Sequence, residues 1–427
     1  MEDAGAGAFL KRVTIIGAGW AGLSAAVHAV QAGWQVHLLE AAPQAGGRAR
    51  RVVHQGLKLD NGQHILIGAY HQTLALMRTV GVDTHTHLWR MPLTLRLPDG
   101  QGLQLPDWPS PLNMLAGIAS ARGWQWSEKW AFIKRAFQWQ QQRFDCPPTM
   151  TVAQLCHGLP TAVMALMIEP LCVSALNLPS TQASAQVFLR VLQDALLGGK
   201  GSSDMLIPRA DQSTLLPDAA LRWLRQHGAQ VDMGQHVQDL SSHLSHPVIL
   251  ACPAWEAARL TRSIYPAWSA QAQALEHTAI TTVYVQANAP LNWPSEVLAL
   301  QTGPDAPAQF VFDKGRLSAD PALQGVIAAV VSGSGRNRAQ ITQAVLQQLR
   351  DQLSLPQASV WLSVLEKRAA FACTPDLKRP PAQIGHQLLA CGDYIQGPYP
   401  ATLEGAVLSG QQAVHLLAKK DIGENTA

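Results

Sequence analysis

The sequence predicts an α/β protein in which a parallel-sheet domain, assembled from discontinuous segments, is interleaved with an α+β domain. Residues 13–40 have the pattern of a strand, a glycine-rich turn, a helix and a second strand, which together make a complete βαβ unit. A further strand-to-helix unit lies at 388–417, and strand-like runs occur between 228 and 253. With 427 residues, the chain is long enough for about two or three domains that each bury a core.

The composition narrows the classes of function. Hydrophobic residues make up 47% of the chain and charged residues 14%, whereas charged residues are roughly a quarter of an average protein. The surface is therefore either unusually neutral or partly covered by an apolar partner such as lipid. A net charge of +3 does not indicate a nucleic-acid partner. The six cysteines form no CxxC pair, and the first residues lack the apolar stretch of a signal peptide, so we expect a cytoplasmic protein with reduced thiols.

The βαβ unit has the spacing of a dinucleotide site. Val13–Ile16 is a short β-branched strand that leads directly into the glycine-rich turn GAGWAG, residues 17–22. A helix of small residues follows from Ala21 to Ala32, and the second strand ends in Glu40. This order of strand, GxGxxG turn, helix, strand and terminal acid predicts a Rossmann-like nucleotide-binding fold.

Each residue of this unit has a physical task. Gly17 permits the tight turn, Gly19 lets the backbone approach a pyrophosphate, and Gly22 lets the helix pack closely on the strand. The start of the helix offers free N–H groups and the positive end of the helix dipole to a phosphate. Glu40 can accept hydrogen bonds from ribose hydroxyls and would repel a 2′-phosphate.

The stretch that begins at Glu40, EAAPQAGGRAR, indicates which dinucleotide is bound. It contains Gly46-Gly47-Arg48 and resembles the extended FAD fingerprint of the amine oxidase and phytoene desaturase superfamily. A glycine pair lets the chain run close beside the cofactor, and Arg48 offers a forked donor for phosphate oxygens. The resemblance implies that FAD is the cofactor.

Two later blocks resemble other parts of the same superfamily. In the C-terminal block, which resembles its closing flavin motif, Gly392-Asp393 precedes a helix that begins near Thr402. The resemblance implies that Asp393 binds the pyrophosphate–ribityl region and that the helix N-terminus faces the pyrimidine edge of the flavin. The middle block, 228–253, resembles the superfamily's return to the nucleotide domain, where Val237 would offer backbone groups to the adenine.

These motifs predict the domain limits and the cofactor contacts. The FAD-binding domain is expected to comprise residues 10–70, 208–260 and 385–420, and the substrate domain residues 71–207 and 261–384. The predicted FAD contacts are Gly17, Gly19, Trp20, Ala21, Gly22, Glu40, Ala41, Gly47, Arg48, Asn61, Gly62, Val237, Gly392, Asp393, Thr402 and Leu403.

The block LDNGQHILIGAYHQTLALMRTVGV, residues 59–82, narrows the resemblance. It resembles the corresponding block of hydroxysqualene dehydroxylases, also called squalene-associated FAD-dependent desaturases, of bacterial hopanoid pathways. Similar correspondence continues through 169–192 and 208–229. In that family a reduced flavin removes the hydroxyl group of hydroxysqualene, giving squalene and water. The resemblance implies a long-chain isoprenoid substrate and makes other enzymes of the squalene pathway candidate partners, while the oligomeric state stays open.

Loss of an allylic hydroxyl group is helped by a hydrogen-bond or proton donor near the flavin. His64 and Asp60 are candidates because their block is expected to run beside the cofactor, and Tyr394 is a third. Asp60 could instead only fix the backbone, and His64 could contact the flavin without transferring a proton. The histidines at 84–87 and 243–246 lack neighbouring ligands at metal-binding spacing, so we predict no metal site.

Segment 110–144 has the composition of a helix at a membrane interface. Trp126, Trp130, Ile133 and Phe137 fall at helical spacing, and the segment holds four of the chain's 13 tryptophans. Its five basic residues against one acidic residue give it a charge of +4 (5 − 1). Either this apolar face contacts lipid, as in a peripheral protein on the inner face of the cytoplasmic membrane, or it packs on the substrate domain's core.

Three alternative functions remain open at this point. A carotenoid-type desaturase would carry the same cofactor motifs but transfer hydride from substrate to oxidised FAD. A flavin-fold amine oxidase fits the apolar middle segment less well, and a lipid carrier without catalysis would bind no flavin. The sequence SGSGRNRA, 332–339, lacks the third glycine of a second dinucleotide motif, so the source of electrons is also open.

Overall fold

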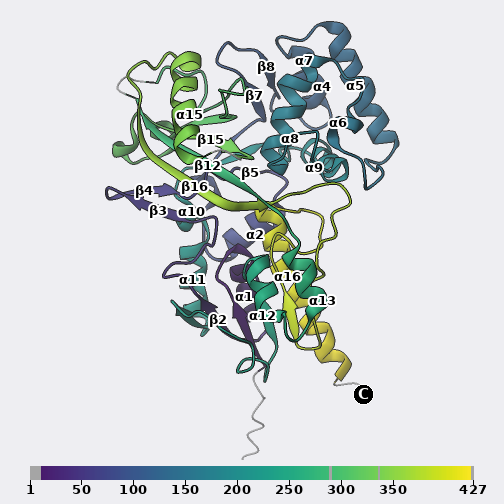
Figure 1. Ribbon diagram of the computed structural model, residues 1–427, viewed down its shortest axis with the longest axis vertical. Helices are drawn as coiled ribbons and strands as arrows, with labels where there is room; N and C mark the ends of the chain where they lie inside the picture. The colour runs from purple at the N-terminus through teal and green to yellow at the C-terminus, as the bar shows by residue number, and fades with distance from the viewer. Residues whose placement is uncertain (1–10, 288–290, 335–336, 425–427) are drawn as a thin grey trace, which may run out of the picture.

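A parallel five-stranded sheet forms the lower half of the molecule in the computed structural model, which describes residues 11–287, 291–334 and 337–424 (Figure 1). Its strand order is β10-β2-β1-β11-β17, and every neighbouring pair is parallel. The strands are β1 (Arg12–Ile16), β2 (Gln35–Glu40), β10 (Gln230–Met233), β11 (Val248–Leu250) and β17 (Leu388–Ala390). The α/β fold predicted from the sequence is confirmed, and one sheet joins three distant segments.

Helices from the same segments surround this sheet. The N-terminal helix α1 packs on the C-terminal helix α16, where Ser24 Oγ donates a hydrogen bond to the carbonyl of Val407 over 2.7 Å. The Gly410 backbone also lies close to α1 there, since a methyl group at Gly410 would approach the Ala21 carbonyl oxygen to 2.4 Å. The helices of this half are α1 (Trp20–Gln31), α2 (His71–Thr79), α3 (Thr84–His87), α10 (Gln212–Leu215), α11 (Pro217–Gln226), α12 (Ala254–Thr261), α13 (Pro266–Gln273) and α16 (Leu403–Glu424).

Two helices that lie outside the expected limits of the nucleotide-binding domain pack on elements inside those limits. Helix α2 begins at His71, just beyond the expected limit at residue 70, yet it packs on α16. Helix α13, beyond the expected limit at 260, packs on α12. Both helices cover elements of this half because their apolar faces are buried there.

An antiparallel five-stranded sheet lies at the upper left in Figure 1. Its order is β13-β14-β15-β12-β16, and α15 packs against β12 and β16. The elements of this part are β12 (His277–Gln286), β13 (Val297–Ala299), β14 (Phe310–Asp313), α14 (Lys314–Leu317), the 3₁₀ helix η2 (Pro321–Leu323), β15 (Val326–Ser332), α15 (Arg338–Leu353) and β16 (Ser359–Phe371). The long strand β16 runs down toward the nucleotide-binding half, which brings its C-terminal end to the site described below (Figure 1).

A cluster of helices forms the upper right of the molecule (Figure 1). It comprises α4 (Leu112–Ser120), α5 (Trp126–Gln141), α6 (Val152–Leu155), α7 (Thr161–Val163), the π-helix η1 (Met164–Ile168), α8 (Glu169–Leu176) and α9 (Ala185–Leu197). Small sheets connect the parts: β3 (Arg51–His54) with β4 (Leu57–Asp60), β7 (Thr94–Arg96) with β8 (Gly102–Gln104), and β5 (Leu66–Ile67) with β9 (Met205–Pro208) and β6 (Leu88–Met91). Within the described ranges, no helix combines the length and the apolar character that crossing a bilayer requires.

Candidate functional site: a cofactor cavity joined to an apolar cavity

A cavity of about 710 Å³ lies where the three nucleotide-binding segments meet. Most of the predicted FAD contacts line it: Gly17, Gly19, Trp20, Ala21, Glu40, Ala41, Gly47, Arg48, Val237, Gly392, Asp393, Thr402 and Leu403. Gly22, Asn61 and Gly62 do not line it. The sequence motifs therefore converge on one space, although they are separated by hundreds of residues.

The glycines of the turn differ in how much space is available for a side chain at each position. Gly17 has φ +112°, and a methyl group there would come within 2.8 Å of the Ala251 carbonyl oxygen. A methyl group on Gly22 would lie 1.9 Å from the Gly17 carbonyl oxygen, so Gly22 serves close helix packing and not the cavity. Gly19 is open, since the nearest atom to such a methyl group is Gly47 Cα at 4.0 Å. The space above Gly19 is the cradle that a pyrophosphate requires.

The N-terminus of α1 faces this cradle. Gly19 is the N-cap residue, and it has no side chain that could satisfy the first N–H groups of the helix. The first turn carries no acidic residue, so the positive end of the helix dipole is not neutralised. The residues present therefore fit an anionic diphosphate at this point.

Glu40 lines the cavity, and its carboxylate also accepts hydrogen bonds from backbone N–H groups of the neighbouring turns. One carboxylate oxygen accepts the N–H of Ala18 over 2.6 Å, and the other accepts that of Ala42 over 2.8 Å. Each carboxylate oxygen has a second lone pair that can accept a ribose hydroxyl. The predicted ribose contact is compatible with this geometry.

Arg48 and Asp393 form an ion pair in the cavity lining. Arg48 Nη2 donates to Asp393 Oδ1 over 2.5 Å, and Nη1 donates to the Ala369 carbonyl over 2.8 Å. The pair links the first nucleotide-binding segment to the last, and the Asp393 side chain is only 10% exposed. Two donors of Arg48 are therefore committed to the protein, and the guanidinium neutralises a carboxylate that would otherwise repel a diphosphate.

Several lining residues carry no recognisable sequence motif. β16 contributes Glu366 and Ala369, and Trp255 at the start of α12 stacks under the Arg368 guanidinium with 4.4 Å to the ring centroid. Asn61 reaches Glu366 from behind the cavity, where its Nδ2 donates over 3.1 Å. No local pattern reveals which strand of another sheet will lie over the site, so only the tertiary fold identifies these residues.

A second cavity, of about 300 Å³, adjoins the first. Its lining is mainly aliphatic and aromatic, and includes Ile65, Leu93, Leu95, Leu171, Leu176, Val187, Val191, Leu192, Ile280, Phe310, Phe312 and Val330. The two cavities share His64, Ala369, Ala401, Thr402 and Leu403. An apolar ligand in the second cavity would therefore meet a cofactor in the first at the N-terminus of α16.

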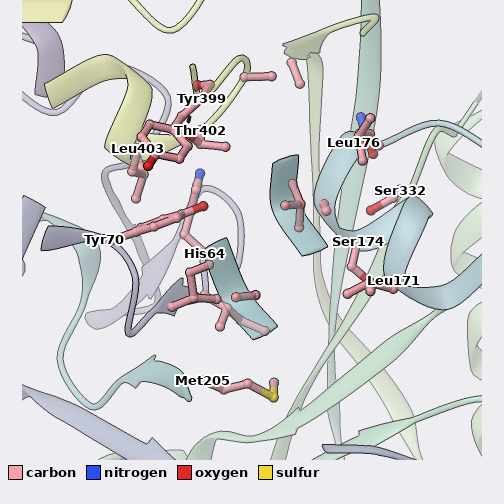
Figure 2. A pocket seen from close by; sticks show the side chains of 18 of the residues that line it. His64, Tyr70, Leu171, Ser174, Leu176, Met205, Ser332, Tyr399, Thr402 and Leu403 are labelled. Atoms are coloured by element: carbon pink, nitrogen blue, oxygen red, sulfur yellow. Dashed lines mark hydrogen bonds between the residues drawn. The ribbon is translucent and has the colours of Figure 1, made fainter. Parts of the chain in front are cut away.

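Figure 2 shows the two sides of this apolar cavity. His64, Tyr70, Thr402 and Leu403 gather on one side, and Leu171, Ser174 and Leu176 of the α8 region face them from the other. His64, Tyr70 and Thr402 place polar groups at the side that adjoins the cofactor cavity. Ser174 and Ser332 add hydroxyl groups on the opposite side, but the lining as a whole is mostly hydrocarbon, which suits a long apolar chain.

His64 lies at the junction, the place where the apolar cavity meets the cofactor cavity, but it is a poor proton donor. Its Nδ1 lies 2.8 Å from the Gly62 carbonyl oxygen, which can only accept, so Nδ1 carries the proton. Burial, together with the nearby Arg48 charge, lowers the pKa of His64. The neutral ring therefore offers Nε2 as a hydrogen-bond acceptor.

Asp60 lies away from both cavities, which corrects its prediction as a proton donor. Its side chain is 1% exposed, with Oδ1 accepting the Gln212 N–H over 2.8 Å and Oδ2 lying 3.7 Å from Lys314 Nζ. The Tyr284 hydroxyl bonds to the Asp60 backbone, donating to its carbonyl over 2.9 Å. Asp60 ties the DNGQH loop to the antiparallel sheet, so its role is structural.

Tyr394 lines the cofactor cavity and not the apolar one. Its ring is buried, and its hydroxyl has no hydrogen-bond partner among the residues that the structure describes. Burial raises the pKa of Tyr394, which keeps the phenol protonated. A buried phenol with an unused hydrogen-bonding group fits a polar cofactor that supplies the partner.

Tyr70 is a polar residue of the junction that has no motif of its own. It lines the apolar cavity on the same side as Thr402 and Leu403 (Figure 2). Burial is the largest cause that raises the pKa of Tyr70, followed by the Glu404 carboxylate. Glu404 is itself buried and caps α2, accepting the N–H groups of Gln72 and Thr73 over 2.9 Å each. This contact places Tyr70, the N-cap of α2, beside the start of α16.

Val237 lies in the lining, but part of its backbone is already engaged. Arg259 Nη2 donates to the Val237 carbonyl over 2.8 Å, and Arg259 Nη1 donates to the Gln238 carbonyl over 2.6 Å. The predicted adenine contact through Val237 stays a prediction. Within the described ranges, no group of three or more His, Cys, Asp or Glu side chains has the arrangement of a metal site.

Comparison with known proteins agrees with this arrangement. Residues 20–418 match the family described as flavin containing amine oxidoreductase. The chain is 25% identical to a hydroxysqualene dehydroxylase of Zymomonas mobilis, with 94% of this chain and 98% of that protein aligned. It is 26% identical to the enzyme of the same name from Sinorhizobium fredii, covering 95% and 98%. A zeta-carotene desaturase of Zea mays is 40% identical, but over 18% of this chain and 15% of that protein.

Solved structures show the same fold at low sequence identity. An oxidoreductase from Methanosarcina mazei superposes with a TM-score of 0.71 at 16% identity, covering 95% of this chain and all (100%) of the other. Putrescine oxidase bound to putrescine superposes with a TM-score of 0.68 at 16% identity, covering 96% and 99%. The convergent cofactor cavity, the matching family and these folds agree, so this chain is an FAD-dependent oxidoreductase that belongs to the flavin-containing amine oxidoreductase family.

Proposed function

We propose that this protein removes the hydroxyl group of hydroxysqualene to give squalene, using reduced FAD. The observation that carries the proposal is the apolar cavity that opens onto the cofactor cavity at His64 and Thr402. The near full-length similarity to hydroxysqualene dehydroxylases supports the substrate. When bound, reduced FAD (FADH2) would supply a hydride to the carbon that loses the hydroxyl group and a proton to that hydroxyl, which leaves as water, so FAD ends oxidised.

The chain's own residues orient the substrate and handle its hydroxyl group. The aliphatic side of the cavity holds the isoprenoid arms and excludes water. Tyr70, protonated because burial raises its pKa, can donate a hydrogen bond to the leaving hydroxyl. His64 Nε2 can accept a hydrogen bond from that same hydroxyl group, which fixes its orientation while its proton stays on the oxygen.

An amine substrate fits this cavity less well. Recognition of an ammonium group by an ion pair requires an available carboxylate. Asp194, the acidic residue in the lining, is paired with Arg190 over 2.6 Å, and Arg190 also donates to the Tyr399 hydroxyl over 3.2 Å. The carboxylate is thus neutralised within the protein.

Product analysis tests the proposal. FAD-loaded protein is reduced and incubated anaerobically with hydroxysqualene, and in parallel the oxidised protein is incubated with phytoene-like polyenes. Squalene formation is expected from the first reaction. New double bonds in the polyene without any squalene would favour a carotenoid-type desaturase, and peroxide release with simple amines would favour an amine oxidase.

Tyr70→Phe tests the assignment within the site. Loss of one hydrogen bond to a leaving group should lower kcat at least about tenfold while the FAD content stays at the wild-type level. Leu95→Ile, an apolar change in the same cavity, is the matched control and should retain most activity. Equal turnover by Tyr70→Phe and wild type would exclude Tyr70 from hydroxyl handling.

A further inference from the structure

Helices α4 and α5 carry large apolar side chains on the outside of the molecule. Trp126, Trp130 and Phe137 of α5 are 67%, 66% and 57% exposed. Leu112 and Leu115 of α4 and Trp108, which precedes α4, are also exposed. These six residues are called the α4–α5 surface below. Helix α5 forms the outer edge of the helical cluster, far from the parallel sheet (Figure 1).

The exposed stripe is distinct from the face that α5 packs on the core. Phe132 and Trp139 are buried on that inner face, with Phe132 in edge contact with Trp124 at 6.0 Å and with Trp139 at 6.3 Å. Trp126, Trp130 and Phe137 are therefore not needed to fill the core. The predicted stripe is therefore divided: Ile133 is partly buried against the core, whereas the other three side chains face outward.

Basic residues outnumber acidic ones around this surface. Residues 107–145 have a charge of +2 (5 − 3), with Arg122, Lys134 and Arg143 exposed among the basic residues and Asp107 and Asp145 exposed among the acidic ones. Glu128 is occupied locally, because it accepts the N–H of Gln125 over 2.7 Å in a capping box at the start of α5. Tryptophans beside exposed basic residues suit the interface of an anionic bilayer.

A short chain of packed elements connects this surface to the apolar cavity. The inner face of α4 lies on β8, where a methyl group on Gly117 would come within 2.4 Å of a Leu105 side-chain carbon. β8 pairs with β7, and Leu95 of β7 lines the cavity. The exposed surface and the cavity are therefore separated by a single hairpin.

From these observations we infer that the α4–α5 surface docks this protein on the surface of an anionic lipid bilayer. The bilayer would hold a hydrocarbon substrate close to the cavity, so the inference deepens the proposed function and rests on it for its purpose. Binding to vesicles is measurable without any substrate. A failure of docking and a failure of the proposed reaction can therefore be told apart.

Flotation of the FAD-loaded protein with vesicles tests the inference. Wild-type protein should float with vesicles of phosphatidylglycerol and phosphatidylcholine, and much less with phosphatidylcholine alone. The variant Trp126→Ser/Trp130→Ser/Phe137→Ser should bind at least about tenfold more weakly, because three exposed apolar anchors are lost. A second variant, Arg122→Glu/Lys134→Glu, keeps the apolar residues and should lose the preference for anionic vesicles.

Val53→Ser/Ile264→Ser is the matched control, since it removes exposed apolar residues from the β3 strand and from the loop before α13. It should float like wild type, and flavin absorbance verifies that each variant is folded. Equal flotation of the triple-serine variant and wild type would overturn the inference. A second result would also overturn it. If the wild-type protein bound no vesicles but formed a concentration-dependent dimer, and the triple-serine variant did not form that dimer, the surface would be a protein–protein interface.

Discussion

Asp60 shows how a polar residue in a motif can serve the fold. It is buried between Gln212 and Lys314, and desolvation is the main cause that raises its pKa to about 6 from an ordinary 3.8. The Lys314 charge and the Gln212 N–H act in the opposite direction. Burial therefore wins, and the folded protein holds a proton on Asp60 that the unfolded chain has already lost at the same pH.

This placement predicts a pH dependence of stability. Because the folded-state pKa is raised, Asp60 favours folding at low pH, and this contribution is lost as pH rises from about 4 to about 6. In Asp60→Asn the residue no longer titrates. The unfolding free energy of the variant minus that of wild type should thus rise by about 2 kcal/mol between pH 4 and pH 6. Denaturant unfolding at both pH values measures it, and an unchanged difference would contradict the assignment.

The Arg48–Asp393 pair predicts coupled effects on the cofactor. Removing Asp393 leaves the Arg48 guanidinium with one of its donors unpaired and removes the predicted ribityl contact. Asp393→Ala should weaken FAD binding by roughly 10- to 100-fold without unfolding the chain. Flavin fluorescence on dilution measures retention.

The double variant Arg48→Met/Asp393→Ala distinguishes a pair from two independent contacts. If the residues act together, its loss of FAD affinity should be smaller than the product of the two single losses. Wild-type flavin occupancy in both single variants would remove both residues from the site. Glu296→Gln, which breaks an exposed pair with Arg316 far from the cavity, is a control for charge removal alone.

At the scale of elements, two glycines at the N-terminus of α1 have different roles: one borders the cofactor cavity and the other allows close packing of the helix. Gly19 faces open space in the cavity, whereas Gly22 faces the Gly17 carbonyl. A methyl group at position 19 would occupy the cradle and clash with no protein atom, since its nearest neighbour would be Gly47 Cα at 4.0 Å. A methyl group at position 22 would force α1 away from β1.

These contacts predict opposite outcomes for two alanine substitutions. Gly19→Ala should fold normally but retain at least about tenfold less FAD, because the pyrophosphate can no longer approach the backbone. Gly22→Ala should lower the unfolding free energy by about 2–3 kcal/mol even without FAD. Gly303→Ala, at a position with open space and no strained backbone, should change neither. Thermal melts of apoprotein and FAD titrations measure the two effects, and equal behaviour of Gly19→Ala and Gly22→Ala would contradict them.

At the scale of the whole molecule, the cofactor cavity is a meeting point of distant segments. Lining residues come from β1 and α1, from the loop after β10, from β16 and from α16. FAD bound in this cavity could contact all of these segments only in the folded state. Binding to the native state alone shifts the unfolding equilibrium by mass action.

Removing FAD should therefore lower the stability of the entire chain. At a free FAD concentration about 100 times the dissociation constant, binding adds about 2.7 kcal/mol, which for a chain of this length is a rise of roughly 3 °C in Tm. Differential scanning calorimetry of apoprotein with and without FAD measures the change. ADP, which would fill only the adenine end of the cavity, should give a smaller rise. An apoprotein whose melting curve does not respond to FAD would contradict the convergence of these segments on the cofactor.

The sequence by itself determined the parallel sheet, its cofactor and most of the cavity lining. The glycine spacing from Gly17 to Gly22, the acid at Glu40 and the GD pair at 392–393 are local signals, because a phosphate imposes its geometry on a few consecutive residues. Such signals can be recognised without knowing which segments meet.

Only the tertiary structure decided the remaining features. In the folded chain Asp60 is buried in the core, outside the candidate site. The Glu404 cap on α2 places Tyr70 where the two cavities meet. Residues of β16 line the cofactor cavity. The tertiary structure also left Trp126 and Trp130 outside, where the helical period alone fits core and lipid equally. Burial and long-range contacts depend on how whole elements pack, and no spacing within a single element encodes them.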